Sequence, residues 1–321
     1  MIFQIKNTLR KISNRNKSIK KLYLSANKIK VRAVSKISDE RFAKMKYKEN
    51  TGKKLNIENP VLFNEKLWWL KINNRDPLLT ICSDKYKVRD YIKKCGLEQI
   101  LTNIYGVYNN ADEIKFEELP DKVFIKCNHG SGTNIIYDRN TFFDEEKFKR
   151  NFNYALKQNY YLQSREWNYK NIIPKLIVEE VLESEDNSSL IDYRFLCFKG
   201  KVKLIFVDID TTNPDGSHSA DARRNIYDTN FNHLDVKVGR EHFDQSLISK
   251  PQNLDKMIEY AEILSKPFPH CRVDLYNIKG KIYFGEITFY HGGGSQNITP
   301  LEWDKKMGSW IDIESETVVK K

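Results

Sequence analysis

The chain has 321 residues, 40% of them hydrophobic, which is enough apolar material for one large domain or two to three small ones. Fourteen Gly, nine Pro and five Cys exclude a collagen-like, a Pro-rich disordered or a disulfide-stapled chain. The cysteines are far apart and form no CxxC pair, so a reducing cytoplasm fits best. No stretch approaches the roughly 20 apolar residues of a membrane span, and no signal peptide is indicated.

The net charge of +11 is concentrated in one segment. Residues 1–54 hold 17 Lys and Arg against Asp39, Glu40 and Glu49, a net charge of +14, so the remaining 267 residues carry −3. Apolar residues recur in this segment at loosely helical intervals: Ile2, Phe3, Ile5, Leu9, Ile12, Ile19 and Leu22. This predicts a basic helical leader that packs on the body, lies on an anionic membrane or binds nucleic acid. Because the body is not basic, we expect no nucleic-acid partner.

The segment after Pro60 predicts helices and one short strand. VLFNEKLWWLKI has the apolar spacing of an amphipathic helix. Residues 78–82 are expected to form a short buried strand. A helix should follow, with Ser83 as its N-cap and Gly96 as its end.

From Lys122 onward, short strands alternate with helices. VFIKCN and IIYD predict strands on either side of the loop HGSGTN, and DEEKFKRNFNYALKQN predicts a helix. KLIVEEVL predicts a further strand, and the helix MIEYAEILSK separates two hairpins, IDYRFLCFKGKVKLIFVDID and CRVDLYNIKGKIYFGEITFY. The first hairpin should turn at Lys199 and Gly200. Hairpins and helices without a long βαβ series indicate an α+β fold.

The sequence HGSGTN combines glycines with a nearby lysine. Gly130, Ser131, Gly132 and Thr133 follow a strand that carries Lys126. Glycines let backbone N–H groups approach a phosphate closely, and a lysine adds a point charge. The GxxxxGK[ST] pattern of a Walker loop is absent. A phosphate-binding loop and an ordinary hairpin turn both stay open from this motif alone.

Two carboxylates on the last predicted hairpin could form a metal site. Arg272 and Asp274 lie on the same face of its first strand, and Glu286 lies on one face of its second strand together with Thr288. If the loop has three residues, closed by Gly280 in αL, the faces coincide and Asp274 and Glu286 become neighbours. A two-residue loop would place them on opposite faces. Neighbouring carboxylates favour a cation such as Mg²⁺, and the alternative is an ion pair between Arg272 and Glu286 on a solvated face.

A competing metal motif is formed by Asp208 and Asp210 after the apolar strand LIFV. Many glycosyltransferases use this Asp-x-Asp spacing to hold a metal and a nucleotide sugar, although so short a motif also recurs by chance. The six histidines show no HExxH or paired spacing, so no zinc site is predicted. The sequence contains no GxSxG elbow and no kinase HRD or DFG motif.

Five segments, taken in order, resemble the ATP-grasp superfamily, and closely its TupA-like branch from bacterial surface-polymer gene sets. They are SDKYKVRDYI, VFIKCNHGSGTN, REWNYKNIIPKLIVEEVL, DYRFLCFKG and RVDLYNIKGKIYFGEITF. Each motif is common by itself, but five in the right order are specific. The resemblance implies an α+β fold in which two subdomains clasp ATP. The expected division is a basic helical leader (1–54), an N-terminal lobe (55–120), a subdomain with the glycine-rich loop (121–182) and a subdomain with the metal site (183–321).

The resemblance also implies how ATP is bound. Lys126 matches the phosphate-binding lysine, and Lys85 matches an earlier lysine at a helix start. The flap over the phosphates matches Gly130, Ser131, Gly132 and Thr133. The linker that takes the adenine matches Glu179, Glu180, Val181 and Leu182.

The metal site follows from the same resemblance. Asp274 and Glu286 match the two magnesium carboxylates, and Arg272 matches the arginine that faces the transferred phosphate, so Arg272 and Lys126 are the expected catalytic residues. The family pattern places Asn two residues after the second carboxylate, whereas this chain has Thr288. A hydroxyl can still coordinate Mg²⁺ or hydrogen-bond its water, so Thr288 is the expected third metal residue.

The implied activity is an ATP- and Mg²⁺-dependent ligase that forms a C–N bond. A substrate carboxylate attacks the γ-phosphate, and an amine then displaces phosphate from the acylphosphate to form an amide. This chemistry needs positioning and charge neutralisation more than an acid–base triad. The expected partners are a carboxylate-bearing glycan or amino acid and an amine, in the synthesis of a cell-surface polysaccharide or teichuronopeptide-type polymer. The candidate substrate contacts are His129, Arg223, Arg224 and Gly293.

Two other functions stay open. One is a metal-dependent glycosyltransferase of surface-glycan synthesis that uses Asp208 and Asp210, and the other is a non-catalytic nucleotide-binding protein. The expected location is the cytoplasm, with peripheral contact at the inner face of the membrane through residues 1–54.

Overall fold

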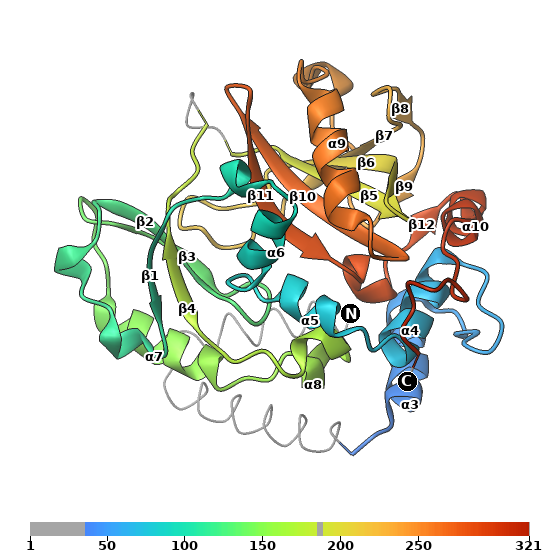
Figure 1. The fold of residues 1–321 in the computed structure, drawn as a ribbon, viewed down its shortest axis with the longest axis horizontal. Coiled ribbons are helices and arrows are strands. Elements are labelled where there is room, and N and C mark those ends of the chain that lie inside the picture. Colours follow the sequence, from blue (N-terminus) through green and yellow to red (C-terminus); the bar gives the residue numbers. More distant parts are fainter. Residues whose placement is uncertain (1–35, 185–188, 321) are drawn as a thin grey trace.

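The computed structural model describes residues 36–184 and 189–320. The described residues form two larger antiparallel sheets (Figure 1). The first has the strand order β1-β4-β2-β3, with β1 at Ile104–Tyr108, β2 at Lys122–Cys127, β3 at Asn134–Asp138 and β4 at Leu176–Glu179. Helix α7 (Glu145–Leu156) packs on this sheet through Phe148 and Phe152. Strand β1 comes from the expected 55–120 lobe and pairs with β4, and the four-part division stays a proposal.

The second sheet has six strands in the order β11-β10-β5-β6-β7-β8. Their bounds are β5 Asp192–Phe198, β6 Lys201–Ile209, β7 Arg223–Tyr227, β8 His233–Leu234, β10 His270–Ile278 and β11 Lys281–Thr288. The first hairpin turns at Lys199 and Gly200, as predicted. Helix α9 (Leu254–Ser265) covers one face with Leu254, Met257, Ala261 and Leu264, all fully buried (Figure 1). The opposite face of the sheet is therefore the one left for a site.

Short helices and a small sheet surround these two layers. The remaining helices are α4 (Phe63–Asn73), α5 (Pro77–Ser83), α6 (Val88–Lys94), α8 (Tyr161–Ser164) and α10 (Leu301–Ser309). Strands β9 (Lys237–Val238) and β12 (Ile298–Thr299) pair with each other. The 3-10 turns are η1 (Glu98–Ile100), η2 (Ala111–Glu113), η3 (Phe116–Glu118), η4 (Trp167–Tyr169), η5 (Gln245–Leu247) and η6 (His291–Gly294). The helices predicted for VLFNEKLWWLKI and before Gly96 are confirmed.

The strand predicted for residues 78–82 is wrong, because this segment is helix α5. Asp76 caps the helix by accepting from the N–H of Leu78 at 2.8 Å, and Pro77 occupies its first position. Both are strong helix-start signals. Ser83 is the last residue of α5 rather than an N-cap. The run of apolar residues is short, and periodicity alone does not separate a buried helix turn from a strand.

The described end of the basic leader packs on the body. Helix α3 (Asp39–Thr51) buries Phe42, Ala43 and Tyr47 in a small core with Trp68. The apolar residues on which the leader helix was predicted lie outside the described residues. Among the residues that the structure describes, no helix is long and apolar enough to cross a membrane.

The last hairpin has a two-residue turn, not the three-residue loop that was the condition for Asp274 and Glu286 to share a face. Ile278 pairs with Lys281, and Lys279 and Gly280 form the turn. Regular pairing from this turn would separate the two carboxylates. The register shifts beyond the pair of Leu275 and Phe284, where β11 has one extra residue. This bulge restores the expected neighbours, since Asp274 pairs with Glu286.

Candidate active site

One face of the six-stranded sheet carries charges from five neighbouring strands. Glu286 of β11 lies opposite Asp274 of β10, which lies opposite Arg194 of β5. Further pairs continue across β5, β6 and β7 in the same way. Because directly paired residues of an antiparallel sheet share a face, their side chains lie on one side. We call this set the charged face: Arg272, Asp274, Glu286, Thr288, Asp192, Arg194, Asp208 and Arg224.

Arg272 is the centre of one end of the charged face. Its guanidinium donates to both oxygens of Asp274 at 2.6 Å, to Glu286 at 2.9 Å and to Thr288 at 3.1 Å. Burial raises the pKa of Asp274 to about 6, although Arg272 acts to lower it. Burial alone would also raise the pKa of Glu286, but Lys85 and Arg272 lower it to about 2. Glu286 is therefore ionised at neutral pH, as a metal ligand must be.

The carboxylates at this end suit Mg²⁺. They lie directly opposite each other, and Mg²⁺ is typically held by one or two carboxylates together with substrate phosphates. Arg272 occupies both oxygens of Asp274, whereas the Glu286 side chain is 36% exposed. Within residues 36–184 and 189–320, no three His, Cys, Asp or Glu side chains gather into one metal-binding group. The chain thus offers two carboxylates and the Thr288 hydroxyl, and a bound metal would take its other ligands from phosphate and water.

Lys85 joins the glycine-rich loop to the charged face. Its ammonium donates to the carbonyl of Gly130 at 2.9 Å and lies 3.6 Å from Glu286. Lys85 lies in the turn that leads into α6, where the Asp84 side chain accepts from the N–H groups of Tyr86 and Lys87. Lys85 is therefore at the junction of the first sheet, the α5–α6 turn and strand β11.

Two buried polar side chains hold this junction together. Asn128 donates to Asp84 at 2.9 Å and to the carbonyl of Ile173 at 3.0 Å. Its side-chain oxygen accepts from the N–H of Lys175 at 2.7 Å. Asn128 and Asp84 are 1% and 2% exposed, so these hydrogen bonds are shielded from water and position Lys85 relative to the loop.

Lys126 and Glu179 form an ion pair across the neighbouring strands β2 and β4. Their side chains are 17% and 9% exposed, and Thr102 donates to the other oxygen of Glu179 at 3.3 Å. The sequence predicts that these two residues bind the phosphates and the adenine, and here their charged groups touch. The other three predicted adenine residues follow β4 on the path to β5: Glu180, Val181 and Leu182.

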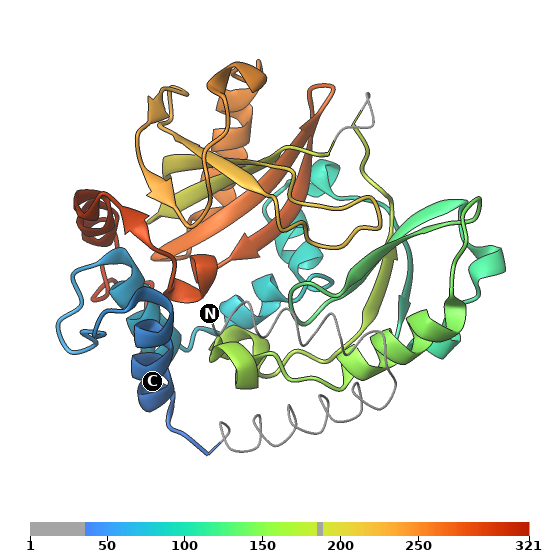
Figure 2. The same ribbon diagram turned by 180° about the vertical axis from the view of Figure 1, so that it is seen from behind.

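The loop between β6 and β7 crosses from the second sheet to the first (Figure 2). The carbonyl of Asp215 accepts from the N–H of Ile136 in β3 at 2.9 Å. A Cβ on Gly132 would lie 3.3 Å from the ring of His218, and the φ of Gly132 is +79°. Positive φ favours glycine at this position, and the imidazole leaves little room for a side chain. The crossing loop therefore places His218 against the glycine-rich loop.

The four predicted substrate contacts lie in different surroundings. His129 is 7% exposed and its Nε2 donates to a carbonyl of α7 at 3.2 Å. Gly293 accepts from a lysine of α4 at 3.0 Å. Arg223 pairs with the half-exposed Asp210 at 2.7 Å. Arg224 is fully buried and belongs to the charged face.

Arginines occupy the first aspartate of the competing Asp-x-Asp motif. Asp208 is 0% exposed and accepts from Arg224 at 2.5 and 2.6 Å and from Arg240 at 2.6 Å. Arg194 lies 3.0 Å from it. Burial alone would raise the pKa of Asp208, but Arg224 and Arg194 lower it to about 2. A metal at Asp208 would have to displace three guanidinium groups, which disfavours this motif as a metal site.

Helix α4 holds the segment after β11 against the charged face. Three side chains of α4 donate to this segment: Asn64 to Gln296, Trp68 to Ser295 and Lys71 to Gly293. The segment places His291 between Arg272, at 2.8 Å from its Nδ1, and Arg224, at 3.1 Å from its Nε2. Burial and these two arginines hold the pKa of His291 well below its ordinary value. A neutral imidazole accepts at one nitrogen only, so His291 can accept from one of the two arginines at a time.

Sequence reasoning missed several residues of the site, notably Arg194, His218, Arg240 and Lys71. Arg194 alternates with Asp192 in the strand DYRF, and this spacing of two was a usable signal. His218 and Arg240 lie in loops, whose positions depend on pairings between distant segments. Such residues carry no local signal.

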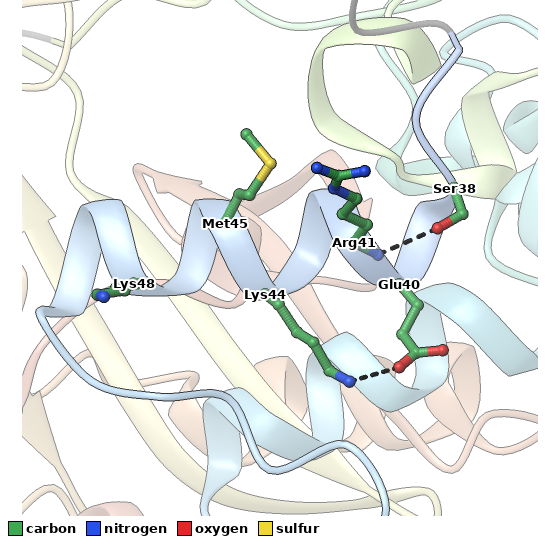
Figure 3. Close-up of a pocket in the computed structure, with 6 residues that line it drawn as sticks. All are labelled: Ser38, Glu40, Arg41, Lys44, Met45 and Lys48. Atoms are coloured by element: carbon green, nitrogen blue, oxygen red, sulfur yellow. Dashed lines mark hydrogen bonds and ion pairs between the residues drawn. The ribbon is translucent and has the colours of Figure 1, made fainter.

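Two hollows differ in their relation to this site. A surface hollow of about 430 Å³ lies along α3, lined by Ser38, Glu40, Arg41, Lys44, Met45 and Lys48 (Figure 3). It contains no residue of the charged face. A cavity of about 10 Å³ lies between α5, η4 and β11, and its lining includes Lys85, Tyr169 and Glu286. This second cavity is the size of a water molecule, so a nucleotide would enter only with movement of the surrounding side chains.

Comparisons with solved structures find ligases at low similarity. An L-amino acid ligase from Bacillus licheniformis is 12% identical with a TM-score of 0.40, over 66% of this chain and 44% of that one. A D-alanine–D-alanine ligase from Bacillus anthracis is 15% identical with a TM-score of 0.39, over 70% of this chain and 64% of that one. This chain therefore spans less than two thirds of the length of either protein.

No curated protein sequence matches this chain. A family model described as TupA-like ATP-grasp matches residues 65–312, which is more than half of the chain and contains both sheets. The predicted resemblance and the α+β fold are confirmed. The chain belongs to the TupA-like ATP-grasp family.

Proposed function

We propose that this protein is an ATP- and Mg²⁺-dependent ligase that joins a carboxylate to an amine with formation of a C–N bond. We place it in the synthesis of a bacterial cell-surface polysaccharide or teichuronopeptide-type polymer. The observation that carries the proposal is the position of Lys85 between Gly130 and Glu286, which connects the glycine-rich loop of one sheet to the carboxylates of the other. Membership of the TupA-like ATP-grasp family supports it.

The charges of the site suit a bound nucleotide. Lys85 and Lys126 would contact the phosphates under the loop Gly130 to Thr133, and Arg272 would face the transferred group. Asp274 and Glu286, with the Thr288 hydroxyl, would hold Mg²⁺. Bound Mg²⁺ neutralises phosphate charge, and ATP supplies the phosphoryl group. The adenine would lie along the segment after β4: Glu179, Glu180, Val181 and Leu182.

Within the chain, these cations already have anionic partners. Lys126 pairs with Glu179, Lys85 lies near Glu286, and Arg272 binds Asp274. Binding of Mg²⁺ and ATP would exchange these partners, so that the lysines contact phosphate and the carboxylates contact the metal. Such an exchange keeps every buried charge paired, which limits its cost.

The proposed reaction has two balanced steps. A carboxylate oxygen of the acceptor attacks the γ-phosphorus, the bond to the β-phosphate oxygen breaks, and ADP and an acylphosphate form. The amine nitrogen then attacks the acyl carbon, phosphate leaves and the nitrogen loses a proton. Arg272 neutralises charge on the phosphoryl group in the first step and on the leaving phosphate in the second.

The direct test traps the acylphosphate with hydroxylamine. Purified protein with ATP, Mg²⁺, hydroxylamine and a panel of uronic acids and amino acids should release ADP and form one hydroxamate per ADP with at least one acid. The Glu286→Gln variant should lose about 100-fold or more of this activity, because a metal ligand is removed. Its fold should persist, since Glu286 is the more exposed of the two carboxylates.

Glu259→Gln is the matched control, because Glu259 is exposed on α9 at the other face of the sheet. Wild-type activity in Glu286→Gln would contradict the metal assignment. Failure of the wild-type protein to form any hydroxamate would contradict the proposed reaction for these acids.

The two phosphate lysines should matter about equally. Lys126→Ala should weaken ATP binding by roughly 2–4 kcal/mol, as expected for the loss of a charge-assisted contact in a partly desolvated site. The N–H groups of Lys85 and of the two residues after it already donate to Asn128 and Asp84, so they do not replace its ammonium, and Lys85→Ala should cost a similar amount. Calorimetric titration of ATP with Mg²⁺ measures both, with Lys87→Ala, an exposed neighbour, as the control. Wild-type affinity in Lys126→Ala would mean that HGSGTN is only a turn.

The glycosyltransferase alternative predicts a different phenotype for Asp208. We expect Asp208→Asn to lower the free energy of unfolding by about 3–5 kcal/mol, because it leaves buried arginines without their carboxylate. Asp210→Asn removes a half-exposed pair and should cost about 0–1 kcal/mol. Urea denaturation measures both variants. Full stability of Asp208→Asn together with lost activity would instead support a catalytic metal at Asp208.

The contribution of Asp208 to the free energy of unfolding should depend on pH in a defined direction. The pKa of Asp208 is lowered to about 2 in the folded protein, so its stabilising contribution is present at neutral pH and is lost as the pH falls toward 2. The stability difference between wild type and Asp208→Asn should therefore shrink below a pH of about 4, the ordinary pKa of Asp.

We further propose that the basic leader, residues 1–54, contacts an anionic membrane, and deletion of residues 1–35 tests this. Their deletion leaves α3 in place on Trp68, so ATP binding should be unchanged. Binding to anionic vesicles should weaken, because the deleted segment holds many Lys and Arg and no Asp or Glu. Co-sedimentation of both forms at low and moderate salt measures this. Equal, salt-insensitive binding of the two forms would rule out a membrane role for the segment.

A further inference from the structure

The far end of the charged face has more positive than negative charge. Asp208 is fully buried, and three guanidinium groups lie within 3.0 Å of its oxygens, those of Arg224, Arg240 and Arg194. Arg194 also lies 3.4 Å from Asp192 and 3.6 Å from Asp274, so it is shared among three carboxylates. The Asp208 carboxylate is therefore the main negative charge that neutralises these three arginines.

Arg240 is the most exposed of these three arginines. Its side chain is 27% exposed, compared with 13% for Arg194 and 2% for Arg224. Among the described residues, Asp208 is the only carboxylate within ion-pair distance of Arg240. Burial lowers the pKa of Arg240 to about 10, and the positive charges of Arg224 and Arg194 act in the same direction. The Arg240 guanidinium can therefore accept a further anion.

Arg240 lies beside the proposed ligase site. His218, which touches the glycine-rich loop at Gly132, lies close enough to Glu286, Arg194 and Arg240 for their charges to act on its pKa. Asp208 in β6 and Asp274 in β10 are separated by one strand, β5. The Arg194 guanidinium reaches both, at 3.0 Å from Asp208 and 3.6 Å from Asp274. The two ends of the charged face are thus neighbours on the same side of the sheet.

We propose that Arg240, supported by Arg194, binds a second carboxylate of the ligase's substrates, in addition to the carboxylate that is activated. This inference rests on the proposed function. A guanidinium matches a carboxylate in shape and offers two parallel hydrogen bonds. The second carboxylate belongs either to a neighbouring acidic sugar of the acceptor or to an amino acid that supplies the amine.

The test is calorimetric titration of the full chain, with Mg²⁺ and ADP present, by two probe acids. Trigalacturonate represents the acidic glycan, and L-alanine represents the amino acid. The wild-type protein should bind at least one of them. Arg240→Gln should weaken that binding about 10- to 100-fold, the loss expected for a charge-assisted contact, and Arg240→Lys should weaken it less.

Arg240→Gln should fold, because Arg224 and Arg194 still neutralise Asp208. Its melting temperature should lie within a few degrees of the wild-type value. Lys237→Gln is the matched control, since Lys237 lies three residues away and pairs with the exposed Glu241. This control variant should bind both acids as the wild type does.

Matched ligands identify the source of the carboxylate. If the glycan supplies it, the methyl ester of trigalacturonate should lose affinity for the wild type and show no difference between wild type and Arg240→Gln. If the amino acid supplies it, L-alaninamide should bind the wild type more weakly than L-alanine does and should bind wild type and Arg240→Gln equally. Equal binding of the acids by Arg240→Gln and wild type, or no binding of either acid by the wild type, would overturn the proposal.

A parallel titration with ATP separates this inference from the proposed function. Arg240→Gln should bind ATP as the wild type does, because Arg240 is not among the proposed ATP contacts. Acid binding that depends on Arg240 in a protein that fails to bind ATP would leave the anion subsite intact and overturn the ligase. If the wild type binds ATP and the Arg240→Gln variant binds the acids as tightly as the wild type does, the anion subsite is overturned and the proposed ligase is not.

Discussion

The pairing of β10 with β11 decides whether the proposed metal carboxylates can meet. Because side chains alternate along a strand, a shift of one residue moves every side chain to the other face. The two-residue turn at Lys279 and Gly280 would by itself separate Asp274 from Glu286, and the bulge at Gly285 corrects this. A Cβ at Gly285 would lie 3.1 Å from the carbonyl oxygen of Asp274, so the bulge leaves little room for any other residue. The end of the charged face that holds the proposed metal carboxylates depends on this one register shift.

Charge alternation explains how so many ionised groups remain buried on one sheet. An isolated buried charge is expensive, whereas a buried pair with complete hydrogen bonding can approach balance. Arg272 gives two hydrogen bonds to Asp274 and one to Glu286, and Arg224 gives two to Asp208. The arrangement is better suited to binding and positioning charged ligands than to stabilising the fold, because apolar residues of the same size would pack at lower cost.

The sequence was most informative where one strand or one helix carried the whole signal. Alternation placed Arg272 and Asp274 on one face, and the Lys-Gly turn of the first hairpin was correctly located. Residues 78–82 form a helix instead of the predicted strand, because a short apolar run fits either element and Asp76 and Pro77 start a helix here. The bulge at Gly285 was not predicted, since a single glycine in a strand does not reveal its register. Arg240 has no local signal, because it lies in a loop and its partner Asp208 lies 32 residues away on β6.

Arg194 gives the two ends of the charged face a physical connection. Its guanidinium lies 3.0 Å from Asp208 and 3.6 Å from Asp274, so both carboxylates compete for one positive charge. A metal at Asp274 would weaken the hold of that carboxylate on Arg194 and leave more of its charge for Asp208 and for an anion at Arg240. Binding free energies are reciprocal, so an acid bound at Arg240 would in turn favour the metal by the same amount. On the proposed assignments, one shared guanidinium would therefore couple occupancy of the nucleotide end to occupancy of the acceptor end.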